Sequence, residues 1–398
     1  SSGSTVCHFV KWQTLFAIGA VPRQKTAPER IKKMNRRTQI SKGLILAFFL
    51  ILESHAGLKR PSGDSIPIIY SPSYNISILG IENFHPFDSK KYRKVFKGVV
   101  EEQTICQSQF YCPKAVSNAE LLSVHTEQYL NSLRKSSVIA RIVEIPLLRF
   151  LPAFILRNGI LEPMRLATGG TILGVKLALR YGWAINLSGG YHHAKAENGE
   201  GFCVFADVPI ALNAIWNEKP NLRVLIVDLD AHQGNGNSSI LGQEERVAIL
   251  DMYNSMIYPN DVEAEQFVRY SVPLKRRINT SEYLEYLYKV LPNAIEEFKP
   301  GLIIYNAGTD IFVEDQLGNL SVTEEGIVKR DAFVFKKAFE NKIPILMVLS
   351  GGYNKKSGNI IAKSINNLIK ENSLRPAPKK EEEPPQQTNN SGKPPCQL

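Results

Sequence analysis

Five short apolar runs in this chain each end in polar or glycine-rich residues, and this repeated pattern limits the folds that the sequence can adopt. Runs of this kind predict buried strands, and here they alternate with segments of helical periodicity. Such alternation is typical of a mainly parallel sheet with helices on both faces, an α/β fold. The runs, each with the residues that follow it, are 183–187 with 188–193, 224–227 with 228–236, 247–250 with 251–254, 302–305 with 306–310, and 345–349 with 350–353.

The remaining pattern divides the chain into a folded body and two appendages. We expect a basic N-terminal extension over residues 1–60, one domain over 61–370 and a disordered tail over 371–398, where Pro, Lys, Glu, Gln and Asn dominate. Residues 142–156 are apolar and interrupted by proline, and they predict a hydrophobic loop. We expect a first strand at 66–70, and helices at 89–102, after the capping box Ser117-x-x-Glu120, and at 168–181, 206–217, 280–298 and 323–340.

The positive charge of the chain is concentrated in its N-terminal extension. The formal net charge is +10 over 398 residues, but residues 1–60 alone hold eleven Lys and Arg against two Glu. The rest of the chain is therefore nearly neutral, and we expect no direct nucleic-acid binding by the folded body. A hydrophobic content of 43% is enough for a substantial core.

An apolar segment at residues 43–52 lies inside the extension, behind Arg36, Arg37 and Lys42. Ten apolar residues after a positive region resemble the core of a signal peptide, and a bilayer span needs about 20. The segment leaves a membrane or secretory route open. Whether residues 1–60 belong to the mature protein stays open as well.

The carboxyl ends of the predicted strands carry residues that can hold a metal ion. Asp230 and His232 are two residues apart, so in extended backbone their side chains point to the same side. Asp310 ends another predicted strand, and the ends of parallel strands meet at one edge of the sheet. Two carboxylates and one imidazole leave a coordination position open, as catalytic zinc requires. The five cysteines show no metal-binding spacing.

Further polar residues at the same edge suit acid–base chemistry. His192 and His193 could take a proton from water and return it to a leaving amine. Tyr353, on a Gly-Gly turn, could donate a hydrogen bond to a developing oxyanion. Together with the metal residues, they favour metal-assisted hydrolysis of an amide. His125, by contrast, lies in a helical segment with no metal-like neighbours, and we expect it to be structural.

These motifs, taken in order, resemble the zinc-dependent histone deacetylase family. The resemblance covers roughly residues 65–370 and rests on SGGYHHA (188–194), GFC (201–203), DLDAHQGNG (228–236), NAGTD (306–310) and SGGY (350–353). Three further motifs are similar to the class IV branch of that family: HPFD (85–88), TGGT (168–171) and GIVKRD (326–331). The resemblance implies a single arginase/deacetylase-type domain.

The resemblance also implies roles for individual residues. It makes Asp230, His232 and Asp310 the zinc ligands, His192 and His193 the acid–base pair, and Tyr353 the residue that polarises the acyl carbonyl. His193 is the better candidate for both proton transfers.

Further residues would support this set. Asp228 would orient His192 and help to bind a structural potassium ion near Asp251, and Gly201 and Phe202 would line the channel for the acyl-lysine stem. Asn235 stands where many family members carry a carboxylate behind the second histidine. An amide orients that ring without adding charge.

The activity implied is hydrolysis of acyl groups from the ε-nitrogen of lysine in histones or other proteins. This predicts a chromatin regulator in the nucleus, with a cytoplasmic location also allowed, and it makes no prediction of oligomeric state. Two alternatives stay open: a ureohydrolase-like enzyme with two manganese ions, and an inactive acyl-lysine-binding scaffold. The first needs a further aspartate cluster near Asp310, where the sequence offers only Asp315.

The hydrophobic loop bears on the length of the acyl group. Surface loops seldom expose as many apolar side chains as Phe150, Leu151, Pro152 and Phe154 provide. These residues either pack beneath the loop or form an apolar wall for a long acyl chain. The second interpretation predicts a preference for fatty-acyl lysine over acetyl-lysine.

Overall fold

The computed structural model describes residues 65–371 and 374, except residues 79, 85–87, 89 and 104. The N-terminal extension with its apolar segment 43–52, the first three residues of the HPFD motif and the chain after 374 lie outside the described residues. All described residues belong to one compact unit. Among them, no helix is both long and apolar enough to cross a membrane.

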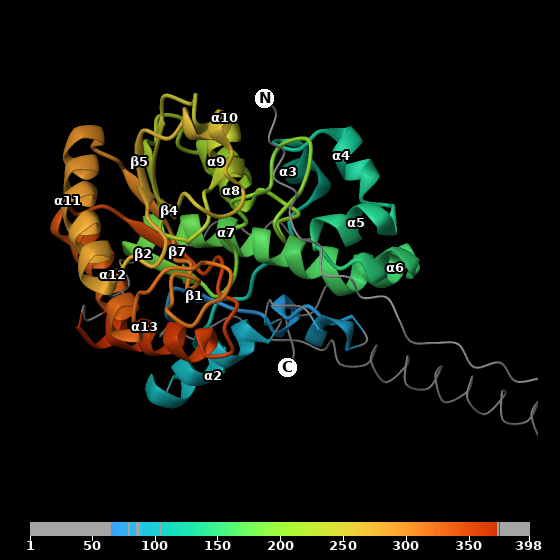
Figure 1. The fold of residues 1–398 in the computed structure, drawn as a ribbon, viewed down its shortest axis with the longest axis horizontal. Coiled ribbons are helices and arrows are strands. Elements are labelled where there is room, and N and C mark those ends of the chain that lie inside the picture. Colours follow the sequence, from blue (N-terminus) through green and yellow to red (C-terminus); the bar gives the residue numbers. More distant parts are fainter. Residues whose placement is uncertain are drawn as a thin grey trace, which may run out of the picture. The chain divides into compact units, whose positions relative to one another are not determined.

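A sheet of seven parallel strands forms the centre of this unit (Figure 1). The predicted α/β fold with a mainly parallel sheet is confirmed, and within the described residues every strand pairing is parallel. The strand order is β1-β2-β7-β6-β3-β4-β5. The strands are β1 (Ile68–Ile69), β2 (Trp183–Asn186), β3 (Val224–Asp228), β4 (Val247–Asn254), β5 (Tyr270–Leu274), β6 (Leu302–Asn306) and β7 (Ile345–Val348).

The register of the central strands brings their last residues into one row. Asp228 at the end of β3 pairs with Asn306 of β6, and Asn306 pairs with Val348 of β7. Val348 in turn pairs with Asn186 at the end of β2. All five strands with reactive segments are consecutive in the sheet, because β4 pairs with β3, and the loops after β2, β7, β6 and β3 begin at the same level.

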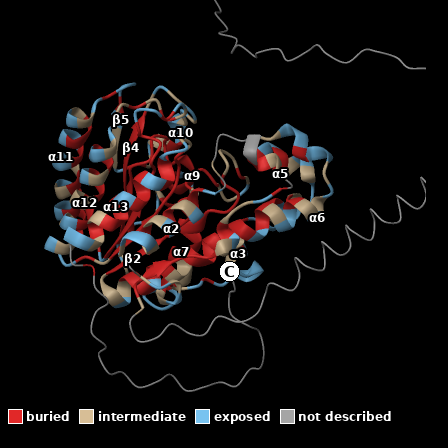
Figure 2. Ribbon diagram, turned by 90° about the horizontal axis from the view of Figure 1, so that it is seen from below, coloured by how far each residue is buried: buried red, intermediate tan, exposed pale blue. Residues whose placement is uncertain are grey.

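Helices cover both faces of the sheet (Figure 1). α2, α13, α12 and α11 pack in sequence as one layer, and α7, α8, α9 and α10 form the other. Figure 2 shows the sheet and the inner helix faces buried, with exposed residues on the outer helix faces. The helices are α2 (Lys91–Gln103), α3 (Asn118–Leu122), α4 (Glu127–Ser132), α5 (Ser136–Ile142), α6 (Ala153–Leu156), α7 (Glu162–Tyr181), α8 (Asp207–Trp216), α9 (Asn235–Leu241), α10 (Val262–Glu265), α11 (Thr280–Phe298), α12 (Glu324–Glu340) and α13 (Ser357–Glu371).

Four predicted helices match the structure to within two residues. The helix expected after the Ser117 capping box begins as predicted but ends at Leu122, and α4 begins at Glu127, so His125 lies between two helices and not inside one.

α7 begins at Glu162 and not at 168. Pro163 in its first turn hid this start, because a proline in a helical pattern usually marks a helix boundary. Gly169 and Gly170, near the middle of α7, lie within the predicted range. A Cβ at Gly169 would lie 1.7 Å from the carbonyl oxygen of Lys114, and one at Gly170 would lie 2.1 Å from the Tyr74 hydroxyl. Both glycines therefore allow α7 to pack closely against these neighbouring segments.

The predicted hydrophobic loop at 142–156 is wrong in part, because most of it is helical. α5 ends at Ile142, a 3₁₀ segment covers Pro146–Phe150, and α6 follows it. With α3 and α4, these short helices pack around a second apolar core that includes Leu121, Tyr129, Ile142 and Leu156. The prolines start these segments and do not prevent helix formation, since proline is accepted in a first helical turn.

A buried ion pair attaches α12 to the centre of the sheet. The Arg330 guanidinium is fully buried; its Nε donates to Asp331, and its Nη1 donates to the carbonyls of Leu229 (3.1 Å) and Gly308 (2.6 Å). Asp331 also accepts hydrogen bonds from the hydroxyls of Tyr305 and Ser364. The last part of the GIVKRD motif thus fixes the backbone beside both predicted metal-binding aspartates.

Candidate active site and metal centre

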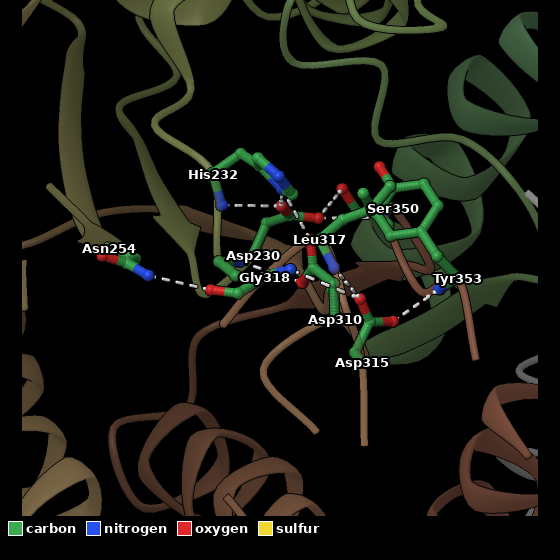
Figure 3. Close-up of polar contacts among 12 residues, drawn as sticks. Asp230, His232, Asn254, Asp310, Asp315, Leu317, Gly318, Ser350 and Tyr353 are labelled. Carbon is green, nitrogen blue, oxygen red and sulfur yellow. Dashed lines mark hydrogen bonds and ion pairs between the residues drawn. The ribbon is translucent and has the colours of Figure 1, made fainter. Parts of the chain in front are cut away.

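Three side chains from two neighbouring strand ends form the one group of potential metal ligands found among the described residues. Ligand atoms of Asp230, His232 and Asp310 all lie within 4.8 Å of one another, and all three residues are buried. Figure 3 shows them pointing toward one another. The His232 Nδ1 atom lies 3.1 Å from Oδ1 of Asp230 and 2.8 Å from Oδ2 of Asp310. These are the three residues that the sequence predicted.

Two glycines keep the space around these carboxylates open. A Cβ at Gly351 would lie 2.6 Å from Oδ2 of both Asp230 and Asp310, and one at Gly308 would lie 2.3 Å from Asp230 Oδ2. Any side chain at either position would fill the place that a metal ion needs. Two carboxylates and an imidazole are also donors that a zinc-class ion prefers. The residues present therefore fit such an ion.

The charge of Asp230 destabilises the charged form of Asp310, whereas, against the effect of burial, His192 and His232 hold the pKa of Asp230 well below its usual range. Burial, and next the charge of Asp230, raise the pKa of Asp310 to about 7. Backbone and side-chain donors offset part of this cost. Oδ1 of Asp310 accepts from the N–H of Ala231, and Oδ2 of Asp230 accepts from the Ser350 hydroxyl and the N–H of Gly351. A positive charge between the carboxylates would offset the remaining cost of burying their charges.

His192 lies against a carboxylate behind it. Its Nδ1 is 2.9 Å from Oδ2 of Asp228, and its Nε2 faces Asp230 at 3.7 Å. Burial alone would lower the pKa of His192, but the charges of Asp228 and Asp230 outweigh burial and raise it to about 9. Asp228 is itself held by the side-chain amide of Asn306. Asp228 thus lies where the resemblance implied.

His193 has an amide behind it instead of a carboxylate. Its Nδ1 is 2.8 Å from Oδ1 of Asn235, whose Nδ2 donates to Glu200 and Asp261. Because those two carboxylates fix the amide orientation, the Asn235 oxygen faces His193 and accepts its Nδ1 proton. The Nε2 atom is then left as a base. Burial, followed by the charges of His192 and His232, lowers the pKa of His193 well below its usual range.

Tyr353 lies beside the metal-binding group on the turn after β7 (Figure 3). Its ring meets the His232 ring edge-on at 6.0 Å and the Phe202 ring at 5.8 Å. Phe202 adopts a left-handed φ of 65°, and Gly201, at φ 52°, has no room for a side chain because a Cβ would lie 2.5 Å from the His193 ring.

A cavity joins these residues to an apolar wall. His192, His193, Gly201, Phe202 and Tyr353 all line it. Its other lining residues include the apolar side chains of Ile76, Ile78, Val143, Ile145, Ile160 and Met164.

The predicted wall residues Phe150, Leu151, Pro152 and Phe154 do not line this cavity. Phe150 is 78% exposed and Phe154 is 55% exposed. Helical backbone explains the difference, because it turns successive side chains in different directions. The same stretch of chain instead contributes Val143 and Ile145 to the wall.

A second buried carboxylate, that of Asp251, lies beside Asp228. Asp251 lies opposite Asp228 in the sheet, and its Oδ1 is buried without a hydrogen-bond partner among the described residues. Burial and the Asp228 charge raise the pKa of Asp251 well above its usual range. An unpaired carboxylate oxygen in this position suits a cation.

His125 is structural, as the sequence predicted. It is buried, and its Nε2 accepts the N–H of Ala206, while its Nδ1 lies 3.3 Å from the carbonyl of Ala196. Asp315, the carboxylate on which the two-manganese alternative depended, is not part of the metal-binding group. Its oxygens accept backbone N–H groups, including those of Tyr353 and Asn354.

Sequence reasoning did not assign several residues around the site. Glu200, Asp261 and Lys195 form a network behind Asn235, with the Lys195 ammonium 2.7 Å from Asp261. Lys91 reaches the turn before Tyr353 from α2. These contacts join segments far apart in the chain, and no local motif marks them.

Comparison with known proteins agrees with this geometry. The chain is 46% identical over 314 residues to histone deacetylase 2 of Arabidopsis thaliana, covering 79% of this chain and 81% of that protein. It is 30% identical over 311 residues to an uncharacterized protein of Picosynechococcus, covering 77% and 96% respectively. A crystal structure of the HDA15 HD domain has the same fold, with a TM-score of 0.63 and 20% identity over 78% of this chain and 89% of that one.

The pattern of the histone deacetylase domain matches residues 85–369, which include every residue discussed at this site except Ile76 and Ile78 of the cavity wall. The chain belongs to the histone deacetylase domain family.

Proposed function

We propose that this chain hydrolyses acyl groups from the ε-nitrogen of lysine side chains in proteins, histones among them. The observation that carries the proposal is a cavity lined by Tyr353 and by two histidines with differently perturbed pKa values, next to a buried Asp-His-Asp group whose His232 ring contacts the rings of His193 and Tyr353. A nuclear location, with the cytoplasm also allowed, follows from this function. The motifs at 168–171 and 326–331 are the basis for assigning the chain to the class IV branch.

In this mechanism Asp230, His232 and Asp310 would hold zinc. When bound, zinc would supply a Lewis acid that polarises the acyl carbonyl and acidifies the attacking water. The neutral Nε2 of His193 takes the proton of that water and later delivers it to the leaving amine. His192, kept protonated by Asp228, supplies positive charge beside the reacting atoms. The Tyr353 hydroxyl donates a hydrogen bond to the oxygen on which negative charge develops.

We also propose that Asp228 and Asp251 help to hold a potassium ion. The buried, unpartnered Oδ1 of Asp251 and the adjacent charge of Asp228 support this assignment. Such an ion would stabilise the charged form of Asp228, on which the orientation of His192 depends.

The first prediction concerns the metal. The full chain should bind about one catalytic zinc ion, as three-ligand open sites do. Asp310→Asn should lose most of that zinc and the turnover with it, because an amide adds no negative charge. Metal content by elemental analysis and thermal melting check this. Two tightly bound catalytic ions per chain would favour the two-manganese alternative instead.

The second prediction concerns the reacting groups. His193→Ala should lower kcat far more than it changes KM, because proton transfer matters mainly in the transition state. Tyr353→Phe should lower kcat by about 10²–10³, the usual effect of one lost oxyanion donor. Tyr288→Phe, on an exposed helix face, serves as a control that keeps the normal rate. Near-normal rates for both active-site variants would contradict the mechanism, whereas no turnover by the unsubstituted chain would favour the inactive scaffold.

The third prediction concerns pH. Asn235→Asp should raise the pKa of His193, because a carboxylate stabilises the imidazolium. Since His193 must be neutral to act as a base, the acid limb of the kcat/KM profile should move to higher pH by about one unit or more. The other groups around His193 are His192, His232, Asp230 and Tyr258, and the substitution leaves them in place.

Glu200→Gln is the matched control for this shift. Glu200 contacts Asn235 and not His193, so its loss should leave the acid limb within a few tenths of a unit of its original position, as expected of a group that touches the base only indirectly. An unchanged or lowered limb in Asn235→Asp would contradict the assigned role of His193.

The fourth prediction concerns acyl length. The apolar wall supports a preference for long-chain acyl-lysine, because each buried methylene contributes ~0.8 kcal/mol. In a series of acyl-lysine peptides, kcat/KM should rise from acetyl toward fatty acyl. Ile145→Glu, in the wall, should reduce activity on the long chain far more than on acetyl.

Leu147→Glu, two residues further on, is the matched control. Leu147 is 69% exposed and does not line the cavity, so its substitution should leave the chain-length preference unchanged. Equal or higher kcat/KM on acetyl-lysine across the series would contradict the proposed preference.

A further inference from the structure

A buried carboxylate holds the turn that carries Tyr353 (Figure 3). Asp315 is 4% exposed, and its Oδ2 accepts the N–H groups of Tyr353 at 2.7 Å and Asn354 at 3.1 Å. Its Oδ1 accepts those of Leu317 and Gly318, at 3.0 and 3.3 Å. One carboxylate therefore ties the loop after β6 to the turn after β7, using both oxygens.

The loop that contains Asp315 also packs against a metal-binding residue. A Cβ at Gly318 would lie 2.0 Å from the carbonyl oxygen of Asp310, so the two backbones are in close contact. The carbonyl of Gly318 in turn accepts a hydrogen bond from the Asn254 side chain at 2.9 Å. Asp315 thus lies in a loop whose backbone is fixed relative to the metal centre.

A buried cation holds the other side of the same turn. The Lys91 ammonium, from α2, donates to the carbonyls of Ser350 at 2.7 Å and Gly351 at 3.1 Å. Gly352, between these contacts and Tyr353, has a φ of 132°, which L side chains rarely adopt. The turn is therefore held at its start by a positive charge and at its end by a negative one.

Such support matters because the turn is intrinsically adaptable. Two consecutive glycines give the backbone before Tyr353 many accessible conformations. A hydroxyl that stabilises a transition state must be held to within about 0.5 Å of its productive position. Charge-assisted hydrogen bonds to the backbone N–H of Tyr353 itself supply that restraint.

We propose that Asp315 is a positioning residue for Tyr353 and that Lys91 supports the same turn from its opposite end. The inference rests on the proposed function, because it assumes that the Tyr353 hydroxyl acts in the reaction. An asparagine at 315 would match aspartate in size, but its NH₂ group would face two N–H donors. Asp315→Asn therefore releases one side of the turn with little change in packing.

A double-mutant cycle tests whether Asp315 acts through Tyr353. Asp315→Asn should lower kcat by about tenfold or more, part of the effect of a lost oxyanion donor, with a smaller change in KM. In the Tyr353→Phe background the same substitution should change kcat by less than about twofold, because residues that act through one group are not additive. Zinc content should stay near one per chain in every variant, because Asp315 contacts no metal-binding side chain.

Asp331→Asn is the matched control, since it also alters a buried carboxylate. Its partners are Arg330, Tyr305 and Ser364, and none of them belongs to the turn. Asp331→Asn should therefore change kcat by the same factor in the unsubstituted chain and in the Tyr353→Phe background. Lys91→Met gives a second measurement of the turn, and it should follow the non-additive pattern of Asp315→Asn. If Asp315→Asn fails to fold, Lys91→Met still tests whether the turn positions Tyr353.

The outcomes distinguish a failure of the proposed function from a failure of the positioning role alone. If Tyr353→Phe alone keeps the full rate, the proposed function fails at Tyr353. If Tyr353→Phe is slow while Asp315→Asn and Lys91→Met turn over normally, only the positioning role is overturned. Equal losses from Asp315→Asn in both backgrounds would overturn it too, because Asp315 would then act independently of Tyr353. Non-additivity for Asp331→Asn would show the cycle to be unspecific and would overturn the inference as well.

Discussion

Two carboxylates, Asp230 and Asp310, are buried within ligand distance of each other, and the rest of the site is arranged around their mutual repulsion. Taking one charge out of water is costly, and a second like charge beside it adds to the cost. The fold offsets that cost with His232, with Lys91 and with backbone N–H groups. The space left by Gly308 and Gly351 also has room for a bound cation, which would offset the remaining cost of burying the two charges. The metal centre is thus a consequence of how the sheet edge is charged.

Carboxylates that accept backbone N–H groups recur around this centre and fix its loops. Asp207 accepts the N–H groups of Gly190 and Tyr191, just before the two histidines, at 2.9 and 2.8 Å. Asp315 does the same for the turn of Tyr353, and Asp310 for the loop after β3. Hydrogen bonds to a charged acceptor are about twice as strong as neutral ones, so they can hold glycine-rich loops that lack side-chain packing. The loops keep open space near the reacting atoms without losing their position.

The sequence predicted the sheet and the metal-binding group because both depend on local signals. Apolar runs mark the strands, and Asp230, His232 and Asp310 follow directly at strand ends that a parallel sheet must bring together. The start of α7 and the helices within 142–156 were missed, because Pro146, Pro152 and Pro163 stand in or beside their first turns, and a proline in a helical pattern usually marks a boundary. Lys91 and Asp315 carried no signal either. Their roles arise from contacts with backbone atoms of distant segments, and any sequence in those segments provides such atoms.

The site is divided between two parts of the fold: the strand ends carry the proposed reacting groups, and other segments carry most of the apolar wall. The histidines, the metal-binding group and Tyr353 all follow neighbouring strands of the sheet, so their geometry depends on its register. Most of the apolar wall comes from outside the sheet: Val143 and Ile145 lie between α5 and the 3₁₀ segment, Ile160 lies in the π-helical turn just before α7, and Met164 lies in the first turn of α7. These side chains belong to or pack against the second core, apart from the strands. Changes there can alter the length of the acyl group accepted while the proton-transfer geometry stays the same. Under the proposed function, the reaction class therefore depends on the sheet edge, and the acyl preference depends on the helical segments beside it.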